Sequence, residues 1–335
     1  MSHELITGKI KPSDESFLPK GFEEKEAIGL NNKDFLTYVT YRYRYNTYPI
    51  TKTLSDYPPC VQIEPTSMCN FRCVMCYQID KSFSGKSHGH MGMMDLNIYK
   101  KAIDELEGNV QAITLASRGE PLMNPNIEEM ISYTGNKFLG FKLNTNASLL
   151  TEKRCHILLQ SGLKTLVFSA DAADKETYEK IRINGKFEIV YQNIKRFSEI
   201  KAKQYPKSKI ITKVSGVNIS QDGQNFDEMT NIWGDLVDDV AFVYYNPWES
   251  AYDNEENTLI APCSDLWRRM FLWQDGRVNP CDYDYKSTIF FGSQPIFGKN
   301  SLKEIWHSDV YNKLRENHLT KSRSKIEPCK RCVAI

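Results

Sequence analysis

The chain has 335 residues, of which 41% are hydrophobic and 25% are charged, so it can bury a large core in one domain or two. Its 43 Lys and Arg residues nearly cancel its 42 Asp and Glu residues, which excludes a global field that attracts nucleic acid or an anionic membrane. The N-terminus has no signal-peptide core, and no window approaches the roughly 20 apolar residues of a membrane span. We therefore expect a cytoplasmic protein with neither nucleic-acid nor membrane partners.

Residues 1–57 form a polar N-terminal extension, within which residues 35–49 alternate Tyr and Arg in a pattern that fits either a helix or an edge strand. From residue 60 onward, apolar runs of strand length alternate with helical patterns. The six apolar runs cover residues 60–65, 110–117, 138–146, 165–171, 209–218 and 239–246.

Helical periodicity separates several of these runs. The clearest helical segments are residues 95–108, 150–162 and 187–203. The first begins at an N-cap, Asp95, and stops at Gly108. Its apolar face consists of Ile98, Ala102, Ile103 and Leu106. Strands that alternate with helices predict parallel strands joined by crossovers, so we expect an α/β fold, a partial (β/α)6 TIM-like barrel over residues 58–257. The active site of such a barrel lies at the carboxyl ends of the strands.

The pattern changes near residue 258. Residues 270–284 read as a β-hairpin with Asp275 and Gly276 at its turn, and residues 301–319 read as one helix. We therefore expect a small second domain over residues 258–335.

The chain has nine cysteines, an odd number, and no export signal, which disfavours disulfides and favours metal or catalytic thiols. Cys69, Cys73 and Cys76 form a tight CxxxCxxC triplet. A structural zinc site needs a fourth ligand nearby, and no His follows at finger spacing. Soft thiolates also hold iron-sulfur clusters, and three cysteines on a cluster of four irons leave one iron open to a further ligand.

The triplet directly after a first strand resembles the radical S-adenosylmethionine (SAM) superfamily, whose open iron chelates SAM. "RGEP" at residues 118–121, "NTNA" at 144–147 and "FSADAADKETYEKIRING" at 168–185 resemble further motifs of that family. One departure is Ala147, where families often have Gly. The resemblance implies that one 4Fe-4S cluster binds the triplet and that SAM contacts Met75, Gly119, Glu120, Asn146, Ser169 and Arg182. Without the resemblance, Met75 would be a core residue, Glu120 a solvent-facing loop residue and Arg182 an exposed helical residue.

The remaining cysteines include a dispersed C-terminal quartet, Cys263, Cys281, Cys329 and Cys332. A zinc ribbon normally has two CxxC pairs, and only Cys329 and Cys332 form one. The hairpin "DGRVNPCDYD" and the helix "SLKEIW" resemble the shortened SPASM, or twitch, domain that follows the barrel in some radical SAM enzymes. That resemblance implies a second 4Fe-4S cluster, fully ligated by the quartet. Two isolated thiols remain, Cys60 and Cys155; we expect Cys60 at the barrel bottom and Cys155 in the core of a helix.

The resemblance implies an oxidoreductase that abstracts hydrogen from a small, polar, sugar-like or cyclitol-like substrate and oxidises an alcohol to a carbonyl. The second cluster would accept an electron, and flavodoxin or ferredoxin would supply the reducing electron. Asp282, directly after a cluster cysteine, is the candidate general base; the alternative is an Asp that caps backbone amides in the hairpin. Tyr283, Asp284 and Tyr285 are weaker candidates.

Other functions fit the same motifs. A radical epimerase would need a thiol or Tyr as hydrogen donor, and a peptide- or protein-modifying maturase often adds a peptide-binding domain. An electron carrier without SAM chemistry would need none of Glu120, Ser169 and Arg182. The polar and aromatic residues 244–257 either line the substrate pocket or form a surface loop.

Overall fold

The computed structural model describes residue 26 and residues 30–219, 224–290 and 292–334. About half of the N-terminal extension, residues 1–25 and 27–29, therefore lies outside the described residues. Residues 35–49 belong to a helix, α3 (Asn32–Thr51), so the helical interpretation of this segment is the correct one. Asn31 caps α3 by accepting a hydrogen bond from the Asp34 amide.

The predicted partial barrel is confirmed. Six parallel strands follow one another in space in the same order as in the sequence. They are β1 (Cys60–Ile63), β3 (Ala112–Leu115), β4 (Gly140–Thr145), β5 (Thr165–Ser169), β7 (Ile211–Asn218) and β8 (Asp239–Tyr244). A separate two-stranded sheet pairs β2 (Arg72–Cys73) with β6 (Arg182–Ile183).

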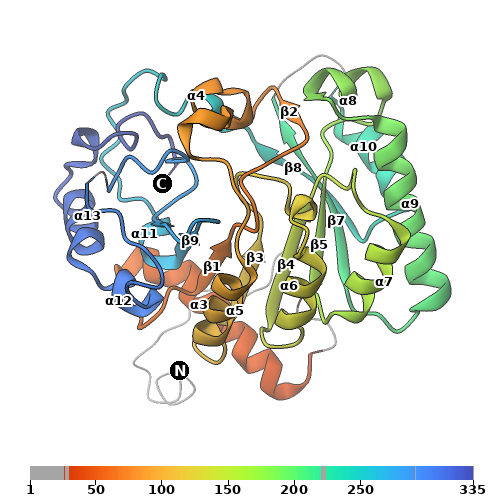
Figure 1. Cartoon of the computed structure of the whole chain (residues 1–335), viewed down its shortest axis with the longest axis horizontal. Coiled ribbons are helices and arrows are strands. Elements are labelled where there is room, and N and C mark those ends of the chain that lie inside the picture. The colour runs from red at the N-terminus through yellow and green to blue at the C-terminus, as the bar shows by residue number, and fades with distance from the viewer. Residues whose placement is uncertain (1–25, 27–29, 220–223, 291, 335) are drawn as a thin grey trace.

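Helices make the crossovers between the parallel strands. They are α5 (Leu96–Leu106), α6 (Ile127–Thr134), α7 (Glu152–Gln160), α8 (Lys175–Ile181), α9 (Phe187–Gln204) and α10 (Phe226–Trp233). In Figure 1, α5 and α6 lie beside the lower parts of β3 and β4, while α7, α8, α9 and α10 lie at the right of the sheet. Asp95 caps α5 as predicted, but Tyr99 is buried on its core face and Ile98 is only half-buried.

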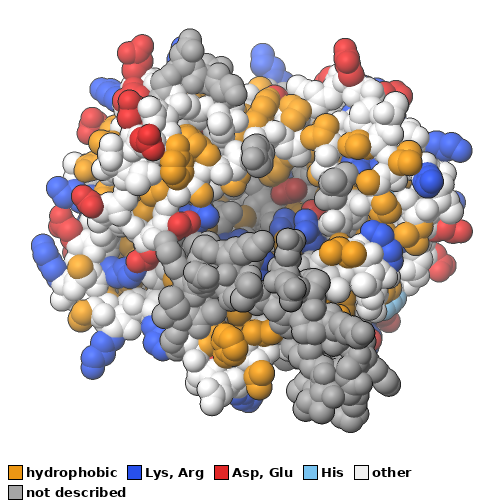
Figure 2. All heavy atoms as spheres, turned by 180° about the vertical axis from the view of Figure 1, so that it is seen from behind, with side chains coloured by type: hydrophobic (Ala, Val, Ile, Leu, Met, Phe, Trp, Pro, Cys, Tyr) orange, Lys and Arg blue, Asp and Glu red, His pale blue; other side chains and the backbone are white. Residues whose placement is uncertain are grey.

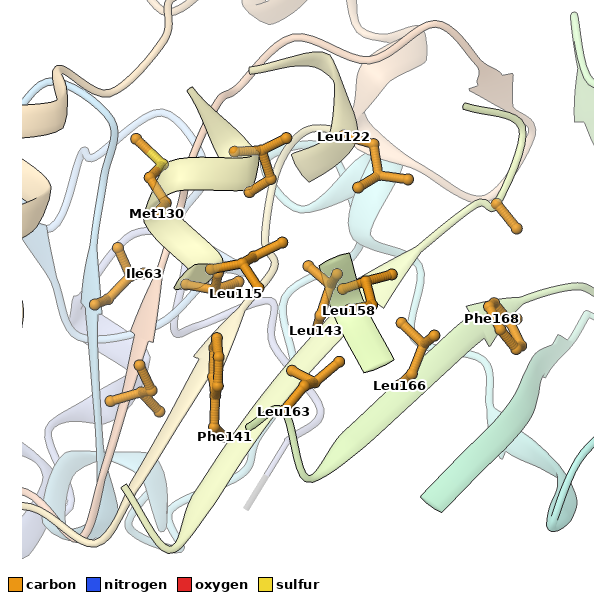
Figure 3. Packing of buried hydrophobic residues seen from close by; sticks show 14 of the residues in the cluster. Ile63, Leu115, Leu122, Met130, Phe141, Leu143, Leu158, Leu163, Leu166 and Phe168 are labelled. Atoms are coloured by element: carbon orange, nitrogen blue, oxygen red, sulfur yellow. The ribbon is translucent and has the colours of Figure 1, made fainter. Parts of the chain in front are cut away.

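Strand side chains that point toward these helices form the core. Figure 3 shows this row, which includes Ile63, Leu115, Leu143 and Leu166, packed beneath Met130 and Leu158. The alternate residues of the same strands point into the barrel, where polar side chains such as Gln62, Thr114 and Lys142 occur. Each strand therefore separates a packed outer face from a polar inner one.

The C-terminal part continues the same sheet. The predicted hairpin consists of β9 (Arg269–Leu272) and β10 (Val278–Asn279), and Gly276 at its turn has a φ of 85°. However, β9 also pairs in parallel with β1, so the barrel sheet extends into the C-terminal part.

The predicted single helix over residues 301–319 is wrong in one respect, because it is two helices. These are α12 (Leu302–Trp306) and α13 (Asp309–Leu319). Ser301 and Glu304 form a capping box on α12, and Ser308 stands at the N-cap of α13, which marks a second helix start. Figure 1 shows both helices at the left, near the short α11 (Asp265–Arg268), and α11 packs against α3.

Candidate active site

The loop with the cysteine triplet follows β1 and is held by the two-stranded sheet. Cys73 of β2 stands opposite Arg182 of β6. The Phe71 amide donates to Cys69 Sγ at 3.4 Å, and the Cys76 amide donates to the Cys73 carbonyl at 3.0 Å. Cys73 and Cys69 both raise the pKa of Cys76, so the three thiols share one site.

These thiols are sheltered from water. Burial raises the pKa of Cys69 to about 12 and also raises the pKa values of Cys73 and Cys76. In this environment the thiols ionise only when a cation stabilises the thiolates. A bound metal ion provides that positive charge, and a thiol that coordinates it is deprotonated. Three soft thiols in one loop are the donor set of an iron-sulfur cluster that keeps one iron open.

Gly119 lets the end of β3 approach the triplet loop. A Cβ at this position would lie 2.7 Å from the Ser67 carbonyl carbon, and closer still to the carbonyl oxygens of Thr66 and Met68. The Glu120 amide donates to the Met68 carbonyl at 2.8 Å. The backbone just before Cys69 is thus packed directly against this glycine, which only a residue without a side chain allows.

Glu120 is fully enclosed and joins the ends of β3 and β4. Its carboxylate accepts hydrogen bonds from the Thr145 hydroxyl (2.6 Å), the Asn146 amide (2.7 Å) and the Leu122 amide (3.1 Å). Burial raises its pKa, while these donors and Arg182 lower it. The solvent-facing interpretation of Glu120 is therefore wrong, since its side chain is 3% exposed.

Arg182 is buried rather than exposed. Its Nε lies 2.6 Å from Oδ2 of Asp171, and its Nη1 donates to Cys73 Sγ at 3.9 Å. Asp171 also accepts from the Val217 amide at 2.7 Å, which ties the loop after β5 to β7. Arg182 thus brings positive charge to the triplet, while its role toward SAM stays a prediction.

The other predicted SAM contacts lie around the same end of the barrel. Met75 is buried in the main core, and Asn146 donates to Asn70 Oδ1 at 3.0 Å, one residue after Cys69. Ser169 ends β5, in register with Ser215 of β7. The structure brings Glu120, Asn146 and Arg182 to the triplet loop, whereas for Ser169 it fixes only a place at a strand end.

The quartet also forms one site. Cys329, Cys263 and Cys332 each raise the pKa of Cys281, after the dominant effect of burial. Among the described residues, no three His, Cys, Asp or Glu side chains already converge as one metal ion would require. A four-iron cluster takes one thiolate on each iron, and four thiols from three separate segments, each buried or half-buried, fit that donor set.

Arg323 holds the quartet segments together, and the sequence analysis missed it. Its guanidinium donates to the carbonyls of Ala261 (3.0 Å), Cys329 (3.3 Å) and Cys332 (2.7 Å), and its side chain is buried. The flanking sequence "KSRSK" looks like an exposed charged run, so no sequence signal marked it.

A largely aromatic cluster, separate from the main core, contacts both cysteine sites. It consists of Tyr77, Phe83, Ala251, Tyr283, Tyr285 and Cys332, with Cys76 and Cys281 packed against it. The rings of Tyr77 and Tyr285 stack with centroids 4.9 Å apart. Water is thus excluded between the triplet and the quartet.

A cavity of about 820 Å³ occupies the inner side of the barrel. Gln62, Thr114, Lys142 and Asn144 line it from the strands, Trp248 lines it near the last strand, and α3 contributes residues at the lower end. Figure 2 views the molecule from the side opposite Figure 1 and shows a hollow near the centre, with basic and acidic side chains at its margin. Cys60 lines this cavity as expected, and Cys155 is buried in the core.

Asp282 faces the same cavity. Burial raises the pKa of its carboxyl to about 6, and a hydrogen bond with the Gln62 side chain opposes this rise. Its charge also raises the pKa of Tyr77, which is next to Cys76 in the chain. Asp282 directly follows Cys281 of the quartet and lines the interior of the barrel.

Asp284 has the capping role that was the alternative for Asp282. Its carboxylate accepts from the amides of Thr288 (2.8 Å) and Ile289 (2.9 Å) and from the Tyr252 hydroxyl (2.8 Å). Tyr283 and Tyr285 pack in the aromatic cluster. Asp284, Tyr283 and Tyr285 are all absent from the residues that line the cavity.

A buried ion pair between Glu64 and Arg118 was also missed. Arg118 Nε and Nη2 each donate to the Glu64 carboxylate at 2.6 Å, and Nη1 donates to the Tyr285 carbonyl at 2.8 Å. The Gln274 amide donates to Glu64 at 3.2 Å. The pair thus connects β1 and the end of β3 to the C-terminal part. The available signal was a charged residue near the carboxyl end of each of two buried strands, Glu64 after β1 and Arg118 in the loop after β3.

Within the part of the chain that the structure describes, no helix is long and apolar enough to cross a membrane.

Comparisons with known proteins match both cysteine regions. The family model described as "Radical SAM superfamily" matches residues 63–223, and the model described as "Iron-sulfur cluster-binding domain" (SPASM) matches residues 263–333. Among curated proteins, a probable GTP 3',8-cyclase of Methanococcus maripaludis is 32% identical over 40% of this chain and 44% of that protein. The chain spans less than half the length of the first curated relatives it matches.

Two solved structures share the fold. Streptococcus suis SuiB bound to precursor peptide SuiA covers 99% of this chain and 82% of that chain, with a TM-score of 0.61 and 13% identity. BtrN in complex with AdoMet and 2-DOIA covers 83% of this chain and 93% of that chain, with a TM-score of 0.54 and 19% identity.

Proposed function

The chain belongs to the radical SAM superfamily and ends in a SPASM domain, and we propose that it oxidises an alcohol of a small polar substrate to a carbonyl. Radical SAM and SPASM domains imply SAM and 4Fe-4S clusters as cofactors. We assign the SAM-binding cluster to the triplet Cys69, Cys73 and Cys76. The quartet Cys263, Cys281, Cys329 and Cys332 would hold the second cluster, and flavodoxin or ferredoxin would be the external reductant.

Oxidation of an alcohol to a carbonyl removes a hydrogen atom from carbon, a proton from the hydroxyl oxygen and one electron. SAM held at the triplet would supply the hydrogen-atom abstraction, and a cluster held by the quartet would supply an electron acceptor. The protein must provide the base, orient the substrate and exclude water.

The observation that carries the proposal is the place of Asp282. Its carboxylate faces the barrel cavity, accepts from Gln62 of β1, and directly follows the quartet residue Cys281. A hydroxyl group in the cavity can therefore transfer its proton to Asp282 next to the site that accepts the electron. Asp284 caps backbone amides in the loop that follows the hairpin, those of Thr288 and Ile289, so this structural task does not require Asp282.

The surroundings support the remaining requirements. Gln62 orients the Asp282 carboxylate, and the aromatic cluster around Tyr77 and Tyr285 excludes water between the two cysteine sites. Trp248, from the polar and aromatic segment at residues 244–257, lines the cavity, as expected of a pocket wall. These features favour a closed polar site for a small molecule over an open groove for a peptide.

The test compares Asp282→Asn with wild type after anaerobic reconstitution, using a panel of polyols and sugars. We expect carbonyl product to fall by about 10²- to 10⁴-fold, the usual contribution of a general base, while SAM cleavage to 5'-deoxyadenosine continues. Asp227→Asn, at an exposed position in the first turn of α10, is the control and should behave as wild type. Solvent deuterium on carbon, without carbonyl product, would establish epimerisation instead. Failure to oxidise any alcohol would reject the proposal.

A further inference from the structure

The barrel cavity carries more positive than negative charge on its strand walls. Lys142 of β4 and Arg269 of β9 line it from the strands. Asp282, from the loop after β10, adds one acidic side chain. Around the amino-terminal ends of the strands and α3, the lining includes three further basic residues and two acidic ones. These are Arg42, Lys164, Lys209, Glu26 and Asp34.

Lys142 stands at a central position in this wall. It is in register with Thr114 of β3, which is in register with Gln62 of β1, so these three inward side chains belong to one row. Gln62 is the partner of Asp282. A molecule that places a hydroxyl at Asp282 therefore extends along this row toward the Lys142 ammonium.

The Lys142 ammonium has no counter-charge in contact. Among the described residues it has no ion pair within 4.0 Å, and Glu26 and Cys60 act on it only through longer-range attraction. Burial lowers its pKa. Arg269, in contrast, is partnered by Tyr45 and by Asp265, whose Oδ1 lies 3.8 Å from its Nε. Lys142 is half-buried, and an ammonium partly withdrawn from water without a contacting anion carries a desolvation cost that an anionic ligand offsets.

Neighbouring polar atoms also lack partners. Ser117 Oγ, Asn144 Oδ1 and Trp248 Nε1 are buried without a hydrogen bond among the described residues, and all three residues line this cavity. Buried polar atoms are normally hydrogen-bonded, so three unpartnered ones at one cavity mark a place where a polar ligand binds.

We propose that the substrate is a small polyhydroxylated molecule with an anionic oxygen group, a carboxylate or a phosphate, which binds at Lys142 while a hydroxyl faces Asp282. Ser117, Asn144 and Trp248 then bind its remaining polar groups. This inference rests on the proposed function, and it narrows the substrate class from any small polar molecule to acidic ones.

The anion is not the carboxylate of SAM. The predicted SAM contacts Glu120, Asn146 and Arg182 are absent from the lining of this cavity, and they cluster around the triplet loop instead. The cavity is therefore a second compartment, next to the SAM region, with its own cation.

Calorimetric titration of the reconstituted protein tests the inference directly, with D-glucuronate, D-glucose 6-phosphate and D-glucose as probes. At least one of the two anions should bind more tightly than glucose. Tighter binding of glucuronate would indicate a carboxylate site, and tighter binding of glucose 6-phosphate a phosphate site. Lys142→Met should weaken that anion by about 10- to 100-fold, the value of one charge-assisted hydrogen bond, without changing glucose binding. Lys142→Arg should retain most of the affinity, and Lys203→Met, on the exposed side of α9, should retain all of it.

Anions that bind no better than glucose, or that bind Lys142→Met as well as wild type, would overturn the inference. The wild-type comparison remains decisive if Lys142→Met does not fold. The two proposals fail separately. If the protein oxidises neutral polyols but binds no anion, the proposed anion site is refuted and the proposed alcohol oxidation stands. If it binds anions through Lys142 but forms no carbonyl product from any alcohol, the anion site stands and the proposed oxidation is refuted.

Discussion

Glu64→Gln removes the acceptor at the centre of the buried pair between the barrel and the C-terminal part. Neither side chain of the pair is exposed, and the carboxylate accepts from Arg118 and from the Gln274 amide. Glutamine has one acceptor oxygen, so its NH₂ group would face the donors of Arg118. Arg118 would then be a buried cation without a counter-charge.

Breaking such a pair by removing one partner costs about 3–5 kcal/mol, a large part of the roughly 5–15 kcal/mol that holds a typical domain folded. We expect the urea midpoint, followed by circular dichroism under anaerobic conditions, to fall accordingly. Replacing both partners by apolar residues, Glu64→Leu with Arg118→Met, should cost less than Glu64→Gln alone because no buried charge remains. Lys153→Met is the control, since its pair with Glu128 is 75% exposed at the lysine and should contribute at most about 1 kcal/mol. A loss below about 1 kcal/mol in Glu64→Gln would refute this reasoning.

Two further predictions concern the clusters, each measured as iron after anaerobic reconstitution, where two four-iron clusters give about eight irons per chain. Gly119→Ala should displace the backbone at Thr66 and Met68, because a Cβ at this position has no room beside that loop. The iron content should therefore fall toward about four atoms per chain. An iron content of about eight would show that the loop accommodates the methyl group. Cys332→Ala should also lose about four irons. Cys155→Ala should lose none, since that thiol lies in the core, and loss of iron from this variant would contradict the ligand count.

Much of the barrel could be read from the sequence, since its outer and inner faces alternate along each strand. Apolar runs and capped helices such as the one at Asp95 predicted six parallel strands, and all six are present. The single helix predicted over residues 301–319 failed because its apolar periodicity continues across Ser308, where a second helix begins. The union of β9 with β1 was not predicted, since pairing between distant strands leaves no local pattern.

The sequence by itself determined the chemistry of the two cysteine sites, because residue type and spacing decide which soft ligands a loop can offer. The tertiary structure alone decided which polar residues share the barrel interior. Gln62, Lys142 and the pair Arg269 and Asp282 come from three distant segments, and each residue looks ordinary in its own stretch of chain. Their common site follows from strand register, and register depends on hydrogen bonds between segments that are far apart in sequence.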